Sequence, residues 1–365
     1  MINIKEGYIT EEIFSRPGIK GYWVNIEGKM EKCIAYPDLL GIIELGDRVS
    51  LNTTANTLNL GSGGYHYIIA NLSNSDKELT PKGHIMKLRY TPMQVKVLSV
   101  EEEESPYHEE MLKANSLDNT PVLVGTLHSM LAPLSLLLGQ EDYKIAYLMT
   151  DGAALPLAFS HNVHELKKRG LLHGTVTVGH AFGGDLEAVN IYSGLLAAKT
   201  IFEPDIIIVT MGPGIVGTGN KWGFTGIEQG EILNAVEALN GIPICLPRIS
   251  FADTRDRHRG ISHHTLTVLS RVCRVKAIVP LPDLGKEKLS YMLEQIRFSS
   301  LVDKYDYTLE MADDTLKIMQ KSNFQLTTMG RTLADDKEFF LTLGAASLTA
   351  SNLLRGKNIN KLTLV

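Results

Sequence analysis

The 365-residue sequence contains few cysteines, no long apolar run and no strong excess of charge. Its three cysteines, Cys33, Cys245 and Cys273, are widely spaced and form no CxxC pair. This usage argues against a disulfide framework and favours buried thiols in a reducing compartment. No run approaches the roughly 20 apolar residues of a membrane span, and the opening segment MINIKEGYITEE lacks the apolar core of a signal peptide. We therefore expect a cytoplasmic protein.

Charge also limits the classes of partner. The net charge is −5, with 21% charged and 44% hydrophobic residues, which is an ordinary balance for a globular protein. A small negative net charge argues against general binding to nucleic acid or to a membrane surface, although a local basic patch can act against the mean. We expect neither nucleic acid nor membrane as a partner.

Several familiar catalytic motifs are missing. The sequence has no GxSxG, no HExxH, no EF-hand loop and no GxxxxGK[ST] segment. The last absence argues against a P-loop nucleotide site. Any catalytic site must therefore come from residues that the fold brings together.

The chain is long enough for two domains, and its patterning changes near residue 100. Residues 1–100 contain short strand-like runs separated by turns, which predict a small β barrel or sandwich. Residues 101–120 begin with EEEE and continue with SPYHEE, a composition typical of a solvated linker. Residues 121–365 form the third segment, an α/β domain that ends in a helical C-terminal segment.

In the α/β domain, apolar runs alternate with helix-like segments. Strands that are apolar almost throughout predict a mostly parallel sheet covered on both faces, hence a doubly wound α/β fold. A helix is expected over Leu186 to Phe202, and two more near the C-terminus, Asp313 to Lys321 and Asp335 to Leu354. Between these two helices, the TMGR segment at Thr328 to Arg331 either closes over the sheet edge or only connects. The six predicted strands are PVLVG, KIAYLMT, TVTVG, DIIIVTM, IPICL and VKAIVPL.

Right-handed crossovers place the carboxyl ends of all parallel strands at one edge of the sheet, where α/β proteins bind their ligands. Polar and glycine-rich loops follow five of the six strands. This convergence is the main argument for a functional site. The loops contain Asp151 after the second strand, His180, Gly183, Gly184 and Asp185 after the third, and two longer segments after the fourth and fifth.

The longest of these polar segments is the arginine loop, which we define as Phe251 to His264, FADTRDRHRGISHH. Its guanidinium groups can bind a phosphate or carboxylate in bidentate fashion, and its histidines can transfer protons. The alternative is internal ion pairing between the arginines and aspartates, with Ser262 capping the next helix. The candidate residues are the anion-binding Arg255, Arg257 and Arg259 and the catalytic Asp253, His258, His263 and His264.

A metal at the arginine loop is left open. The segment HRGISHH matches no standard zinc-ligand spacing, and the adjacent His263 and His264 need a bent backbone to share one ion.

The glycine loop, which we define as Gly212 to Gly226, begins GPGIVGTG and includes a literal GxGxxG. A dinucleotide fingerprint also requires an immediate helix and an acidic residue at the end of the next strand, and both are missing here. The loop instead predicts an anion site made by backbone N–H groups and the following helix N-terminus. The alternative is a folded glycine loop without a ligand. The candidate ligand-binding glycines are Gly212, Gly214, Gly217 and Gly219.

The segment GHAFGGD offers a smaller candidate. Gly183 and Gly184 would allow close approach of the backbone to a ligand, and His180 would transfer protons. Asp185 would assist His180 or simply cap the helix expected from Leu186.

At these loops the chain resembles an uncharacterised bacterial family, the domain of unknown function 3866. The resemblance covers most of the chain from Leu51 to Thr267, and the TMGR segment lies beyond it. It implies one protein of two parts, with no activity, substrate or cofactor attached. The matching segments are LNTTANTLNLGSGGYHYIIANL, YLMTDGAALPLAFS, TVTVGHAFGGDLEAVNIYSGLLAA, MGPGIVGTGNKWGF and RISFADTRDRHRGISHHTLT.

Two functions fit these observations. The first is an enzyme that acts on a small anionic metabolite at the carboxyl edge of the sheet, with hydrolysis or another group transfer as its chemistry. The second is a non-catalytic ligand-binding or regulatory protein that senses a nucleotide or acidic metabolite. Both functions have a small anionic ligand as partner. The sequence does not identify a cofactor, and it leaves open whether the protein forms a homo-oligomer.

Overall fold

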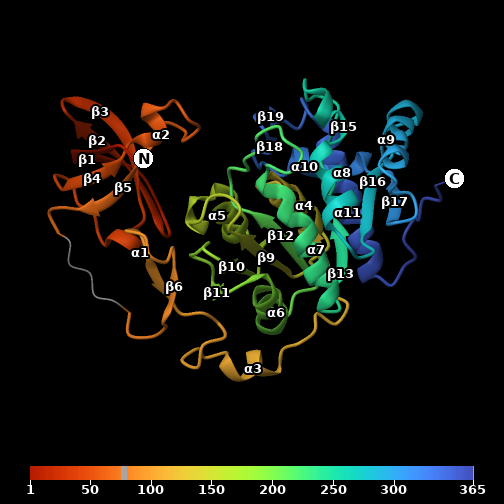
Figure 1. The fold of residues 1–365 in the computed structure, drawn as a ribbon, viewed down its shortest axis with the longest axis horizontal. Coiled ribbons are helices and arrows are strands. Elements are labelled where there is room, and N and C mark those ends of the chain that lie inside the picture. Colours follow the sequence, from red (N-terminus) through yellow and green to blue (C-terminus); the bar gives the residue numbers. More distant parts are fainter. Residues whose placement is uncertain (75–79, 365) are drawn as a thin grey trace. The chain divides into compact units, whose positions relative to one another are not determined.

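The computed structural model describes residues 1–74 and 80–364. The chain divides into two compact units, Met1–Val97 and Leu98–Val365, each with its own core (Figure 1). Within the described ranges, none of the helices combines the length and the apolar character needed to cross a membrane.

The first unit is built on a closed five-stranded barrel, which confirms the small all-β domain. The strand order is β1-β2-β3-β5-β4, and β3 and β5 run parallel while the other neighbours are antiparallel. Two short helices and a separate two-stranded sheet accompany it: α1 (Pro37–Leu40), α2 (Thr54–Thr57), β6 (Ile85–Lys87) and β7 (Val95–Val97). The barrel strands are β1 (Ile4–Arg16), β2 (Ile19–Ile26), β3 (Lys29–Ala35), β4 (Arg48–Asn52) and β5 (Tyr65–Asn71).

Alternation of side chains explains most of the barrel. In β2, Tyr22, Val24 and Ile26 face the core, while the residues between them are only half-buried. The turn to β3 uses Glu27 and Gly28, both with positive φ (52° and 84°), as tight hairpin turns require. β1 gives little signal in the sequence, because most of that strand is solvent-exposed and no regular apolar alternation marks it.

The second unit contains an eight-stranded parallel sheet, which confirms the doubly wound α/β class. The strand order is β11-β10-β9-β12-β8-β13-β16-β17. The strands are β8 (Pro121–Val124), β9 (Ile145–Thr150), β10 (Gly174–Val178), β11 (Leu186–Ala188), β12 (Ile206–Met211), β13 (Ile242–Cys245), β16 (Ile278–Pro282) and β17 (Asp306–Glu310).

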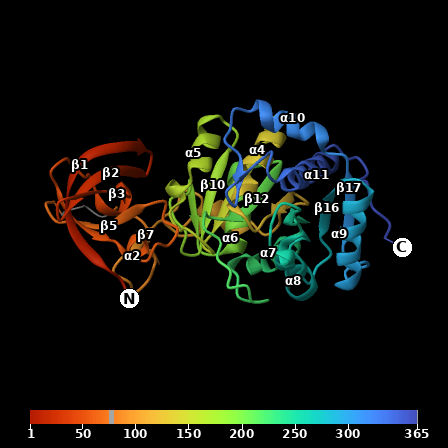
Figure 2. The same cartoon turned by 90° about the horizontal axis from the view of Figure 1, so that it is seen from above.

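Helices cover both faces of this sheet (Figure 2). The core over one face contains α4 (Leu131–Gly139), α5 (His161–Lys168), α10 (Asp313–Lys321) and α11 (Lys337–Leu354). The core over the other contains α6 (Ile191–Phe202), α7 (Glu228–Ala238) and α9 (Lys286–Phe298), with α8 (His263–Thr267) on the same side. Successive strand residues alternate between the two cores, for example Leu123 and Val124 in β8. The short α3 (His108–Lys113) packs against α6.

Near the middle of the sheet, the helices that follow neighbouring strands lie on opposite faces. β8 is followed by α4 on one face, while its neighbours β12 and β13 are followed by α7 and α8 on the other. Where neighbouring strands send their chains to opposite faces, their carboxyl ends leave a crevice that commonly binds ligands. The glycine loop follows β12 and the arginine loop follows β13, so both lie at this crevice.

The structure corrects the helix expected over Leu186 to Phe202. Its first residues form β11, which pairs in parallel with β10, with Leu186 beside Val176. The helix itself begins at Ile191, where the Asn190 side chain accepts hydrogen bonds from two backbone N–H groups. Asp185 therefore does not cap a helix.

One buried glutamine ties the sheet to α7 at the carboxyl ends of β8 and β13. The side chain of Gln229, which is 0% exposed, donates hydrogen bonds to the carbonyls of Val124 (2.8 Å) and Leu246 (3.0 Å). We expect Gln229→Leu to lower the free energy of unfolding by about 2 kcal/mol, because a buried carbonyl is left with fewer donors. Chemical denaturation measures this, with the exposed Gln320→Leu as control. An equal effect of the two changes would contradict the prediction.

Candidate functional site

The arginine loop folds back on itself as a short antiparallel hairpin. β14 (Ile249–Ser250) pairs with β15 (Gly260–Ile261), and the N–H of Ser262 donates to the carbonyl of Arg248 (2.9 Å). The short helical turn η4 (Asp256–His258) lies between these strands, and α8 begins directly after Ser262. The hairpin therefore brings the histidine of the turn close to the two histidines that begin α8.

Asp253 is the centre of an ion-pair network. Its carboxylate, with a side chain only 2% exposed, accepts hydrogen bonds from Arg248 (2.9 Å) and from Arg255 (2.8 and 2.9 Å). The hydrogen bond from Arg255 is the main reason why the pKa of Asp253 lies well below its usual range. A second buried carboxylate, Asp336, pairs with Arg331 (2.8 Å) and accepts from Ser250. Asp253 and Arg255 thus form internal pairs.

The three predicted arginines have different surroundings. Arg255 is paired with Asp253, and Arg259 lies over the rings of Phe251 (5.6 Å) and Tyr291 (6.0 Å). Within residues 1–74 and 80–364, the Arg257 side chain makes no hydrogen bond or ion pair, and it lines two neighbouring hollows. Arg257 is therefore the arginine of this loop best placed to bind a ligand.

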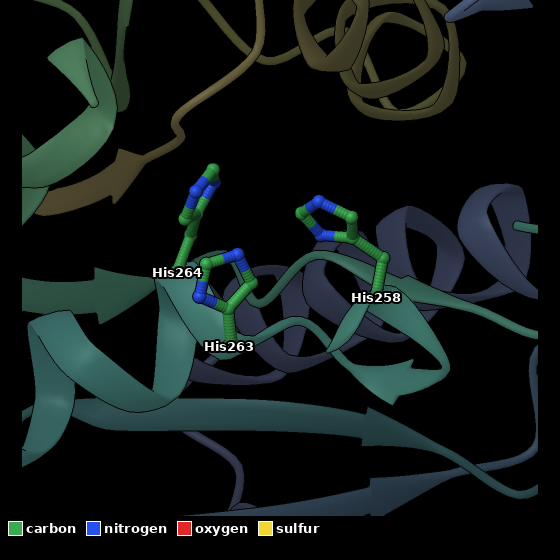
Figure 3. Close-up of side chains that lie close together, drawn as sticks. All are labelled: His258, His263 and His264. Atoms are coloured by element: carbon green, nitrogen blue, oxygen red, sulfur yellow. The ribbon is translucent and has the colours of Figure 1, made fainter. Parts of the chain in front are cut away.

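His258, His263 and His264 form one cluster (Figure 3). One ring nitrogen from each lies within 4.8 Å of the others, and the ring centroids are 4.1–5.1 Å apart. The three rings therefore approach one another although their sequence spacing matches no standard zinc motif. Because Ser262 has an extended backbone (φ −56°, ψ 140°) and α8 starts after it, both adjacent rings lie near that of His258. These three residues could hold a metal ion.

All three imidazoles are held neutral at pH 7. Burial, followed by the charge of Arg248, lowers the pKa of His258 to about 3. Burial, followed by the neighbouring His263, lowers the pKa of His264 to about 4. The pKa of His263 is also lowered, again mainly by burial and then by Arg257. Neutral imidazoles offer a lone pair to a proton or to a metal ion.

The arginine loop and the glycine loop line one cavity of about 160 Å³. A second, larger hollow of about 770 Å³ adjoins it and shares Gly219 and Arg257. His263 lines the larger hollow, whereas His258 and His264 line the smaller. The smaller cavity is lined by Ile215, Val216, Gly217, Gly219, Arg248, Arg255, Arg257, His258, His264 and Met329.

The four predicted glycines divide into two pairs. Gly217 and Gly219 line the cavity, and within the described part of the chain their N–H groups donate no hydrogen bond. Gly212 instead packs against the 151–154 loop, where a Cβ would lie 2.3 Å from the carbonyl oxygen of Ala154. Gly214 needs its positive φ of 103° to turn the chain. Only the later pair of the predicted glycines faces the cavity.

Asp151 and His180 belong to a different part of the sheet edge. The N–H of His180 donates to the Asp151 carboxylate (2.8 Å), after β10 and β9 respectively. β10 lies four strand positions from β13, which corresponds to about 19 Å at the usual strand spacing. The structure does not bring this pair together with the arginine loop.

After β10 the chain returns alongside this strand, in a turn that is stabilised by Gly183, Gly184 and Asp185. The N–H groups of the two glycines donate to the side chains of Glu187 (2.6 Å) and Thr177 (3.1 Å). Asp185 accepts from the backbone and hydroxyl of Thr175, near the amino end of β10, and pairs with Lys167. The expected proximity of Asp185 to the ligand edge is wrong, because the loop runs back beside β10 before β11 begins.

Sequence reasoning missed two groups at the sheet edge, Arg248 and Glu228, and left the place of the TMGR segment open. Arg248 lines the cavity, and its position shortly after the apolar strand IPICL could have identified it. Met329 also lines the cavity, so the TMGR segment does close over the edge. Glu228, the first residue of α7, packs against Gly152 and accepts from Thr150, and burial raises its pKa to about 7. Its position in the first turn of a helix gave no sign of this burial.

One comparison with known proteins gives a match. The model of the family described as Protein of unknown function (DUF3866) matches residues 32–347 of the 365-residue chain. The chain therefore belongs to this family, as its segments had indicated. No curated protein matches the chain.

Proposed function

We propose that this member of a family without an assigned activity is an enzyme that acts on a small anionic metabolite. The substrate carries a phosphate or a carboxylate, and the reaction is a hydrolysis or another group transfer. One observation supports this proposal above the others. Arg257 and two glycine N–H groups, which have no hydrogen-bond partner within residues 1–74 and 80–364, line the same cavity as two neutral histidines, at the crevice of a parallel sheet.

The charge around the cavity favours an anion. Three guanidinium groups line it, those of Arg248, Arg255 and Arg257, and Asp253 is the carboxylate that pairs with the first two. A ligand phosphate or carboxylate would bind the third through charge-assisted hydrogen bonds. The N–H groups of Gly217 and Gly219 add donors without adding charge.

The size of the cavity favours one small anionic group. A volume of about 160 Å³ is several times the roughly 30 Å³ that a water molecule occupies in the liquid. The rest of a larger metabolite would extend into the adjoining hollow past Gly219. The histidines would then lie beside the bond that links the anionic group to the rest.

Arg257→Gln tests the anion site. We expect it to weaken binding of inorganic phosphate, or of the best ligand from a panel of phosphorylated and carboxylated metabolites, about 10- to 100-fold, because a charge-assisted pair is lost. Thermal-shift titration of the purified protein gives the affinities. The matched control is Arg259→Gln, which removes the same charge from the same loop but outside the cavity.

Equal affinities for wild type and Arg257→Gln would contradict the anion site. A ligand that stabilises the protein but is never converted in a product assay would contradict the enzyme and leave the ligand-binding or regulatory function.

A further inference from the structure

The histidine cluster has features that proton transfer alone does not explain. Proton transfer needs one or two imidazoles, whereas here three present a ring nitrogen to a common point, all within 4.8 Å (Figure 3). The Nε2 atom of His263 is buried and has no hydrogen-bond partner within residues 1–74 and 80–364. A buried ring nitrogen without a partner is costly, and a ligand at that point would remove the cost.

Neighbouring groups hold two of the rings in place. The Nδ1 atom of His258 lies 2.8 Å from the hydroxyl of Ser262, and that hydroxyl also accepts from the N–H of His264. The His264 ring stacks on Phe224, with centroids 3.9 Å apart and planes 5° from parallel. Ligating histidines in metal sites usually have their second nitrogen fixed in this way by another polar group.

We infer that His258, His263 and His264 bind one divalent transition-metal ion, with Zn²⁺ as the best fit. Nitrogen ligands suit zinc and its neighbours, whereas magnesium and calcium require oxygen ligands. Nitrogens around a tetrahedral zinc lie about 3.3 Å apart, so modest rotation of the side chains closes the observed spacing. The group contains no fourth histidine, cysteine or carboxylate among the described residues. Three protein ligands and one open position are typical of catalytic zinc.

The open position is expected to take an anion. Arg248, Arg255 and Arg257 oppose a bare cation electrostatically, and Asp253 offsets only part of their charge. An anion between the metal and Arg257 would compensate the positive charge of both. This coupling rests on the proposed anion site, whereas the metal site itself does not.

Zinc titration of the chelator-treated full-length protein tests the metal site. We expect one Zn²⁺ per chain by calorimetry and by metal analysis, and binding at least about a hundredfold weaker in His263→Ala and His264→Ala. His161→Ala is the matched control, because His161 and His164 form a histidine pair on α5 outside the cluster, with ring centroids 6.5 Å apart. Its zinc binding should equal that of the wild type.

A second measurement avoids dependence on the folding of variants. Co²⁺ bound to the wild-type protein should give the strong visible absorption of a tetrahedral or five-coordinate nitrogen site. Absence of stoichiometric zinc binding by the wild type, or unchanged binding in both cluster variants, would overturn the inference.

Phosphate separates this inference from the proposed function. Excess inorganic phosphate should tighten zinc binding about 5- to 150-fold, and zinc should tighten phosphate binding by the same factor. Arg257→Gln should abolish this coupling and keep one zinc per chain. Zinc binding without any coupling supports the metal site and counts against the anion site. Phosphate binding without zinc binding has the opposite meaning.

Discussion

Replacing Asp253 by alanine should lower the free energy of unfolding by about 3–5 kcal/mol, because it leaves a buried charge without its partner. The Arg248 side chain is only 7% exposed and its guanidinium donates to Asp253 at 2.9 Å. Burial already opposes the charged form of Arg248 and lowers its pKa, while Asp253 acts in the opposite direction. Chemical denaturation at neutral pH measures the loss.

Two further variants identify the cause of that loss. Asp256→Ala removes an exposed carboxylate from the same loop and should change stability by no more than about 0.5 kcal/mol. The double variant Asp253→Ala with Arg248→Met removes both charges and should be more stable than the single variant. If the double variant is no more stable than Asp253→Ala, the cost does not come from an unpaired guanidinium.

The fold could be predicted where a single periodicity governs a whole element. The central strands are apolar on both faces, so their sequences are continuous apolar runs. The edge strand β11 has only three residues, LEA, and joins the sheet through the return of the chain beside β10. The other edge strand, β17, is DYTLE, a five-residue run in a part of the chain where no strand was predicted. Short edge strands depend on their neighbours more than on their own residues.

The site could be predicted as far as topology determines it. The glycine and arginine loops follow neighbouring parts of one parallel sheet, so their meeting at one edge follows from the strand order. The partners within the arginine loop could not be predicted. The β14–β15 hairpin decides that Arg255 bonds to Asp253 while Arg257 extends into the cavity. Sequence spacing also concealed the approach of His258 to His263 and His264, because spacing rules assume regular helix or strand geometry.

The length of the sheet edge explains why the predicted residues form two separate groups and not one site. The sequence predicts that every polar loop lies at one edge and that this edge forms one site. An edge of eight strands is about 34 Å long, since neighbouring strands are about 4.8 Å apart. The polar residues accordingly separate into the arginine-loop group near β13 and an acidic group, Asp151 and Glu228, near β9.

Glu228 in the acidic group should make the stability of the protein depend on pH. Burial raises the pKa of Glu228 from its ordinary 4.5 to about 7, although the hydrogen bond from Thr150 acts in the opposite direction. Its place at the start of α7 also favours the charged form, but such helix-end effects are typically only about 0.3–1 kcal/mol. Burial therefore outweighs both.

The sign follows from the two protonation states. Below pH 4.5 the carboxyl is protonated in the folded and the unfolded chain and makes no difference to stability. Between pH 4.5 and 7 the unfolded chain loses this proton while the folded chain keeps it, so stability falls as the pH rises. Above pH 7 the loss is complete. Its size is on the order of 3 kcal/mol, since one pKa unit is about 1.36 kcal/mol.

Glu228→Gln should remove this dependence, because the neutral amide keeps the shape of the side chain and can still accept from Thr150. Denaturation of both proteins at pH 5 and pH 8 should show the variant more stable than the wild type at pH 8, by on the order of 3 kcal/mol, with most of that gain absent at pH 5. Glu231→Gln is the matched control, because Glu231 is exposed on the first turn of the same helix. If the variant gains no stability at pH 8, Glu228 is ionised in the folded protein at no cost. If the gain over the wild type is equal at pH 5 and pH 8, the gain does not come from the ionisation of Glu228.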